Sequence, residues 1–171
     1  MTSREREEAY LRRWRKKAMS GDPTAFHNTA ASYRILGKPQ LAFRWWNKIS
    51  RKDGNNLVEL GYCYHHGAGV RRNLTAAERL YRAAIRSQWI TDFGREEALY
   101  LLAVLSLKKT GRVVLTEIKR LLRRANLDGD YPQAQDLLEA LRPYGSDKVC
   151  TCRRFLRRGL AITYCPIHRK K

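Results

Sequence analysis

Residues 57–87 read LVELGYCYHHGAGVRRNLTAAERLYRAAIRS, which is two helical patterns separated by a glycine-rich loop. Leu57, Leu60, Gly61 and Tyr64 are spaced as i, i+3, i+4 and i+7, so they share one face of a first helix. A second apolar stripe follows the loop, as expected for an amphipathic helix. This stripe consists of Ala76, Ala77, Leu80, Tyr81 and Ala84.

The same two patterns recur along the chain with a period of a few tens of residues, which is typical of repeat architectures. The spacing varies because the loop GKP at 37–39 is short and because QWITDFG, at 88–94, adds residues before the third repeat. Aligned positions of the second helix are Trp14, Trp46, Tyr81 and Leu122, and those of the first are Ala25, Asn56, Ala98 and Ala134.

Residues 60–84 closely resemble the Sel1-like repeat, a TPR-like helix pair with the pattern A-x3-LG-x2-Y-x2-G-x-GV-x6-A-x3-Y-x2-AA. The resemblance is strong over 54–88, fair over 21–53 and weak over 94–129, where Ser106 replaces the tyrosine. It implies an α/α solenoid that mediates protein–protein interaction and has no catalytic residues. The signature positions are Gly61, Tyr64, Gly67, Gly69, Val70, Ala77, Tyr81 and Ala84.

We therefore predict an all-α fold, a right-handed α/α solenoid of about three Sel1-like helix pairs with a small C-terminal zinc-binding cap. Short amphipathic helices bury both faces only when neighbouring pairs stack on them. The predicted repeat domain spans 1–145, with a half repeat at 3–21, repeats near 22–53, 54–88 and 94–129, and an extra helix at 132–142. The tail is 146–171. Helices are expected near 3–19, 23–36, 39–51, 56–66, 74–88, 95–109, 114–126 and 132–142, with Pro23, Pro39 and Pro132 in first turns.

The tail contains four residues of metal-ligand type, Cys150, Cys152, Cys165 and His168. Three thiolates and one imidazole suit a tetrahedral structural Zn²⁺ site. A reducing cytosol favours metal binding over a disulfide, although three reduced thiols or a disulfide remain the alternatives. The spacing is loosely similar to the SWIM-type pattern Cys-x-Cys-xn-Cys-x-His, with one extra residue before the histidine.

The charge balance is strongly basic, with 35 Lys and Arg against 16 Asp and Glu, a net charge of +19. Such a surface attracts acidic proteins or nucleic acid. The longest apolar run, 98–107, is about half of the roughly 20 residues that span a bilayer, and no secretion signal is visible. We therefore expect a cytoplasmic protein that does not enter membranes and is a monomer or weak oligomer.

We predict a non-enzymatic scaffold that binds an acidic partner protein, as an adaptor, regulator or toxin-neutralising protein. The toxin-neutralising role is proposed by analogy of fold alone. No catalytic triad, carboxylate pair or phosphate loop is visible in the sequence. The alternative is a nucleic-acid-binding protein that uses its basic surface and zinc tail. The candidate contact residues for either partner are Lys119, Arg120, Arg123, Arg124, Arg153, Arg154, Arg157 and Arg158.

Three further features are expected to be structural. The Gly67-Ala68-Gly69 stretch lacks the third glycine and the preceding strand of a dinucleotide site. Cys63 lies in a predicted repeat helix, where a buried thiol is the default. The pair Trp45-Trp46 is expected to pack in the core, with at most one exposed ring.

Overall fold

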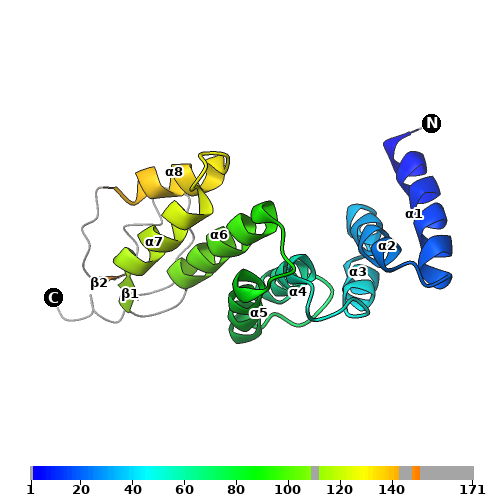
Figure 1. Cartoon of the computed structure of the whole chain (residues 1–171), viewed down its shortest axis with the longest axis horizontal. Helices are drawn as coiled ribbons and strands as arrows, with labels where there is room; N and C mark the ends of the chain where they lie inside the picture. Colours follow the sequence, from blue (N-terminus) through cyan, green and yellow to red (C-terminus); the bar gives the residue numbers. More distant parts are fainter. Residues whose placement is uncertain (1, 109–111, 143–147, 151–171) are drawn as a thin grey trace. The chain divides into compact units, whose positions relative to one another are not determined.

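The computed structural model describes residues 2–108, 112–142 and 148–150, and these form eight helices and one short antiparallel β-ladder (Figure 1). The helical character predicted from the sequence is confirmed. The ladder was not expected. The elements are α1 (Ser3–Met19), α2 (Pro23–Ile35), α3 (Pro39–Trp46), α4 (Gly54–His66), α5 (Leu74–Arg86), α6 (Asp92–Lys108), β1 (Arg112–Val114), α7 (Leu115–Ala125), α8 (Pro132–Ala140) and β2 (Lys148–Cys150).

The chain divides into two compact units, Met1–Gly94 and Arg95–Lys171. The division lies inside the predicted repeat domain, whose boundary with the tail at residues 145–146 stays a prediction. Among the described residues, no helix has both the length and the apolar character that a bilayer crossing requires.

Most helices begin where the sequence provides a cap. The side chains of Thr2, Asp22, Asp53 and Asn73 each accept a hydrogen bond from a backbone N–H in the first turn of the following helix. Such caps satisfy N–H groups that have no partner inside the helix. The three predicted first-turn prolines do begin helices α2, α3 and α8.

Two predicted helix boundaries are wrong by three residues or more, and the others agree with the structure within two residues. Helix α3 ends at Trp46 rather than at residue 51, because the chain tightens into i−3 hydrogen bonds at Lys48 and Ile49. Helix α6 begins at Asp92 rather than at 95, because the Thr91 hydroxyl accepts the Gly94 N–H at 3.1 Å and so caps it.

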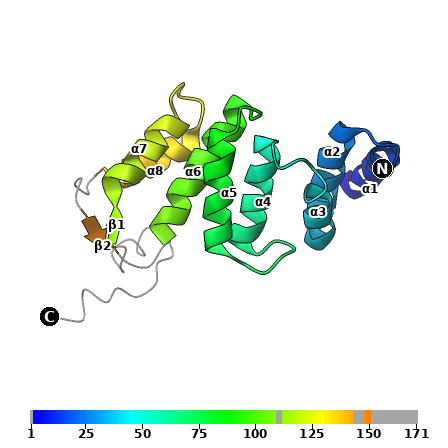
Figure 2. The ribbon, with the colours of Figure 1, turned by 60° about the horizontal axis from the view of Figure 1, so that its bottom comes forward.

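In the first unit, each helix packs against the next one along the chain, from α1 to α5 (Figure 2). The predicted alignment agrees with the burial. Ala25 and Asn56, at equivalent positions of the first helices, are both fully buried. Trp46 and Tyr81, at equivalent positions of the second helices, are 1% and 0% exposed. Both rings of the Trp45-Trp46 pair are buried, as expected.

Three glycines of the signature permit this packing. Gly67 ends α4 in the left-handed conformation, with φ of 74°, which only glycine adopts without cost. Gly69 also has positive φ, and any Cβ there would clash with the Pro39 carbonyl at the start of α3. Gly61 lies against the ring of Tyr81, which joins α4 to α5.

The second unit contains α6, α7 and α8, of which α7 and α8 pack on each other. The aligned positions Ala98, Leu122 and Ala134 are all fully buried here. The rings of Tyr100 and Tyr131 are in contact, with centroids 5.4 Å apart. Strand β1 pairs with β2 in antiparallel register and leads directly into α7.

Candidate interaction surface

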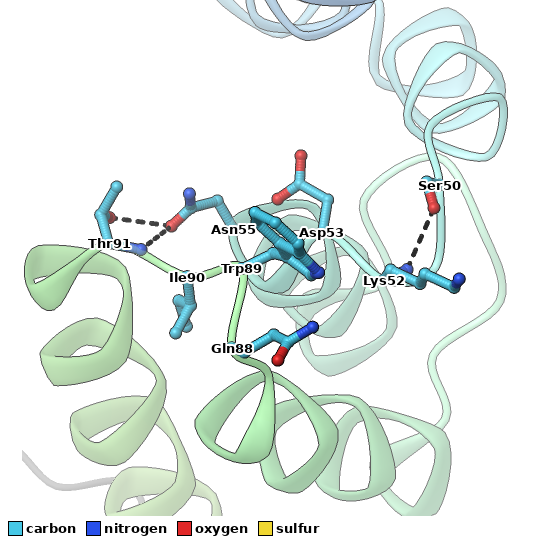
Figure 3. Close-up of a pocket in the computed structure, with 8 residues that line it drawn as sticks. All are labelled: Ser50, Lys52, Asp53, Asn55, Gln88, Trp89, Ile90 and Thr91. Atoms are coloured by element: carbon cyan, nitrogen blue, oxygen red, sulfur yellow. Dashed lines mark hydrogen bonds between the residues drawn. The ribbon is translucent and has the colours of Figure 1, made fainter.

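A hollow of about 590 Å³ opens between the turn that precedes α4 and the segment that joins α5 to α6 (Figure 3). The exposed indole of Trp89 stands in the middle of its lining. The lining residues are Ser50, Lys52, Asp53, Asn55, Gln88, Trp89, Ile90 and Thr91.

Backbone hydrogen bonds fix the two sides of the hollow to each other. The Ser87 hydroxyl donates to the Lys52 carbonyl at 2.7 Å, and the Gly54 N–H donates to the Trp89 carbonyl at the same distance. These bonds join residues that are about 35 positions apart in sequence. The Trp89 N–H in turn donates to the Ser87 hydroxyl at 3.0 Å. The backbone that carries Trp89 is therefore held in one position.

Side-chain contacts and two glycines tighten the same junction. The Thr91 hydroxyl donates to the Asn55 side-chain oxygen at 2.9 Å. A Cβ on Gly94 would clash with the Asn55 side chain, and a Cβ on Gly54 would stand 2.5 Å from that of Ile90. Only glycine at both positions allows so close an approach.

Trp89 differs from the other three tryptophans in its surroundings. It is 63% exposed, whereas Trp45 and Trp46 are 9% and 1% exposed. Trp14 is half-buried, and the Lys17 ammonium lies 4.9 Å from its ring centroid. Trp89 is thus the tryptophan whose ring is most available to another molecule.

The polar groups around Trp89 include both hydrogen-bond donors and acceptors. Lys52 is exposed and carries a positive charge. Within the described part of the chain, the side-chain N–H groups of Asn55 and the Gln88 amide make no hydrogen bond. Asp53 supplies a carboxylate, one oxygen of which caps α4 by accepting the Asn56 N–H at 3.1 Å. Lys52 and these N–H groups can therefore bind acceptor groups of a ligand.

The four candidate contact residues on α7 have different surroundings. Lys119 and Arg123 line a groove of about 470 Å³ between α7 and α8, together with Arg142. Arg120 forms an ion pair with Glu117 of its own helix at 2.9 Å. Arg124 is exposed and does not line the groove.

Cys63 and its histidine neighbours have the structural roles expected of them. Cys63 is 1% exposed, and burial raises the pKa of its thiol to about 12, so it stays protonated and unreactive at neutral pH. His65 is also buried, and its Nδ1 lies 3.3 Å from the Tyr81 hydroxyl. The His66 ring stacks on that of His65.

The predicted zinc ligands lie at the edge of the described residues or beyond it. Cys150 is the last residue of β2, where its backbone is in register with Arg112 of β1. Cys152, Cys165 and His168 lie outside the described residues, as do the four tail arginines named above. Over the residues that the structure does describe, no group of three or more His, Cys, Asp or Glu is arranged to hold a metal ion.

Trp89 is absent from the predicted contact residues, because QWITDFG fits the repeat pattern only as an insertion. A signal was present: insertions between repeats often map to a binding face, and this one carries two aromatic residues that no repeat position requires. Neither a family model nor a curated protein matches this chain. The interpretation of the hollow therefore depends on its own geometry.

Proposed function

We propose that this chain is a non-enzymatic, cytoplasmic scaffold, a Sel1-like α/α solenoid that binds an acidic partner protein. The observation that carries the proposal is the distribution of cations among the helices. Lys and Arg number seven in α1, one in α3, three in α5 and four in α7. These four helices together have fifteen, whereas the other four have three, two in α6 and one in α2; the pair α2 and α3 alone shows no difference.

This uneven distribution of Lys and Arg supports a single basic side of the proposed solenoid. When helix pairs stack in sequence order, the second helices of successive pairs follow one another along the same side. In the first unit, the cations of α1, α3 and α5 would then add to one positive field. Of the eight acidic residues in helices other than α1, six lie in α4, α6 and α8. Such a field selects a partner of complementary charge and accelerates its association.

A protein partner is favoured over nucleic acid because the aromatic rings beside these cations are already occupied. Proteins that bind single strands present aromatic faces on which successive bases stack. Here Trp45 and Trp46 are buried, and the Lys48 ammonium lies 4.2 Å from the Trp45 ring centroid. Several cations also have acidic partners within their own helix, as in the pair Arg82–Glu78 at 3.0 Å.

The tail is proposed to bind one structural Zn²⁺ through Cys150, Cys152, Cys165 and His168. The donor set of three thiolates and one imidazole supports a closed tetrahedral site. Its first proposed ligand, Cys150, is the last residue of β2, which pairs with β1, the strand immediately before α7. This pairing supports a tail that covers the end of the helical array.

The proposal is tested by purifying the tagged, full-length chain from its native cytosol, with and without nuclease. The control is a charge variant in which three exposed arginines of α1 and α5, namely Arg12, Arg13 and Arg79, are replaced by Glu. We expect the same acidic proteins to be retained after nuclease treatment and to be lost with the charge variant.

The nucleic-acid alternative makes the opposite prediction. Capture that disappears with nuclease, together with a mobility shift of random duplex or single strands that weakens steeply as salt rises, would support it instead. Capture that survives both nuclease and the charge reversal would contradict a partner chosen by charge.

A further inference from the structure

We infer that the hollow around Trp89 is the anchor site for the acidic partner, and that it takes an apolar side chain flanked by carboxylates from an extended segment of that partner. This inference rests on the proposed function, because it names the site and the chemistry of the same binding event. The features that support it are the exposed indole on a fixed main chain, its apolar neighbours, and the Lys52 charge with the side-chain N–H groups beside it.

The first support is an exposed tryptophan on a rigid backbone. Trp89 leaves 63% of its surface to solvent although it belongs to one of the most apolar residue types. Hydrogen bonds to Gly54 and Ser87 hold its main chain in place, and the Ser87 hydroxyl in turn donates to the Lys52 carbonyl. A main chain already held in position loses little conformational entropy on binding, and tryptophan is enriched among residues that dominate binding energy.

The second support is the set of apolar residues close to Trp89 in sequence. Ile90 lines the hollow and is half-buried, and Phe93, the second residue of α6, is 66% exposed. Single exposed apolar residues are ordinary, but two aromatic residues exposed by 63% and 66% within five positions offer apolar area to a partner.

The third support is the charge and hydrogen-bonding character of the rim. Lys52, the Asn55 side-chain N–H groups and the Gln88 amide can all donate to a ligand. The single carboxylate of the lining, on Asp53, already accepts a hydrogen bond from α4. Carboxylates accept hydrogen bonds and donate none when ionised, so acidic residues beside the apolar anchor complement this rim.

A nucleobase stacked on Trp89 fits the site less well. A nucleic acid needs cations along its phosphates, but the flanking cations are engaged elsewhere. Lys48 lies over the Trp45 ring, and Arg51 donates to the Asn47 side chain at 2.8 Å. Lys52 is then the one cation in the lining, too few for the row of phosphates that a strand presents.

The test is a selection of short random peptides displayed on phage, using the full-length chain as bait. Each round includes counter-selection on the Trp89→Ala variant, which removes peptides that merely bind a basic surface. We expect the surviving peptides to share an apolar residue with Asp or Glu beside it. No surviving peptide, or survivors without carboxylates, would overturn the inference.

A selected peptide is then synthesised with a fluorescent label and titrated against matched variants. We expect Trp89→Ala to weaken its binding by about tenfold or more, as for a central anchor residue. Trp89→Phe should retain most of the affinity. Met19→Ala, which removes an equally exposed apolar side chain at the end of α1, should leave the affinity within about twofold.

Charge is tested separately with Lys52→Glu and Lys16→Glu, which change the net charge equally at two exposed positions. Only Lys52→Glu should weaken binding of the acidic peptide several-fold. Equal effects would mean that the rim of the hollow is not the contact, and would overturn the inference. Tighter, Trp89-dependent binding of a labelled oligothymidine strand would overturn it in favour of nucleic acid.

The two proposals fail in different ways. If partners captured from the cytosol are acidic proteins but bind the Trp89→Ala variant equally well, the anchor site is wrong and the scaffold function stands. If capture depends on nucleic acid, the scaffold function itself is wrong, whatever peptides the selection provides.

Discussion

The ring of Tyr81 lies so close to the bare Cα of Gly61 that a methyl group added there would stand 2.5 Å from a ring carbon. Tyr81 is fully buried, so its ring has no space into which to withdraw. Two residues of the sequence signature, 20 positions apart, therefore form the contact that holds α4 against α5.

Gly61→Ala should destabilise the protein through this contact. Overpacking of a rigid core costs about 1–3 kcal/mol, which exceeds the gain of roughly 1 kcal/mol from replacing glycine within a helix. We expect a net loss in the free energy of unfolding, measured by urea denaturation. Tyr81→Leu removes the obstructing ring carbons, so the double variant should lose less than the sum of the two single variants. Strict additivity would contradict a direct contact.

Tyr81→Phe should measure the contribution of the hydrogen bond between Tyr81 and His65 to stability. The variant keeps the ring but removes the hydroxyl that lies 3.3 Å from the Nδ1 atom of His65. The loss of one buried hydrogen bond should lower the free energy of unfolding by about 1 kcal/mol. Tyr10→Phe, at a site that is 44% exposed, is the control and should have almost no effect.

The stability contributed by Glu59 should decrease as pH rises. Burial raises the pKa of this carboxyl, and the Arg34 guanidinium, 2.8 Å away, opposes part of the rise. The folded state therefore holds the proton more tightly than the unfolded state. The resulting stability is complete below the unfolded pKa of about 4.3 and is lost as pH rises through the folded value.

The direction of this pH dependence is checked by urea denaturation of the unchanged protein and of the Glu59→Gln variant. Both are measured at several pH values from acidic to neutral. The difference in unfolding free energy between the two should shift in favour of Glu59→Gln as pH increases. Arg34→Met removes the opposing charge and should extend the shift to higher pH. A difference that moves the other way would show that the ion pair outweighs burial.

The thiols should fall into two classes on labelling with iodoacetamide. Cys63 should stay unlabelled in the folded chain, because it is 1% exposed and its pKa is raised to about 12. The proposed zinc should protect Cys150, Cys152 and Cys165 until a chelator is added, and mass spectrometry should then count three labels. Elemental analysis should find close to one zinc per chain, and labelling of the tail without chelator would contradict the site.

Cys165→Ser tests whether the tail stabilises the helices. Because the proposed tail covers the end of the array, the variant should lower the thermal midpoint of the helical signal in circular dichroism. An unchanged midpoint, with zinc lost, would mean that the tail is an independent module. Cys63→Ala is not a suitable control because it leaves a cavity in the core. The control is Ser106→Ala, at a half-buried helical position.

The helices and their order could be predicted from sequence because their signals are local. Apolar spacing identifies one face of each helix, and prolines and capping residues mark most of the starts. The aligned positions Ala25, Asn56, Ala98 and Ala134 proved to be fully buried. The predicted ends were less accurate, as at Trp46, because apolar spacing does not show where the backbone changes to the i−3 hydrogen bonds seen at Lys48 and Ile49.

The Trp89 hollow arises from pairing between segments that are far apart in the chain. Hydrogen bonds from Ser87 and Thr91 reach Lys52 and Asn55, about 35 residues away. Periodicity indicates which side chains share a face of one helix, but it carries no information about which distant segment covers them. The helices thus follow from local pattern, whereas the position of the Trp89 indole, which is 63% exposed, follows from long-range contacts of its backbone.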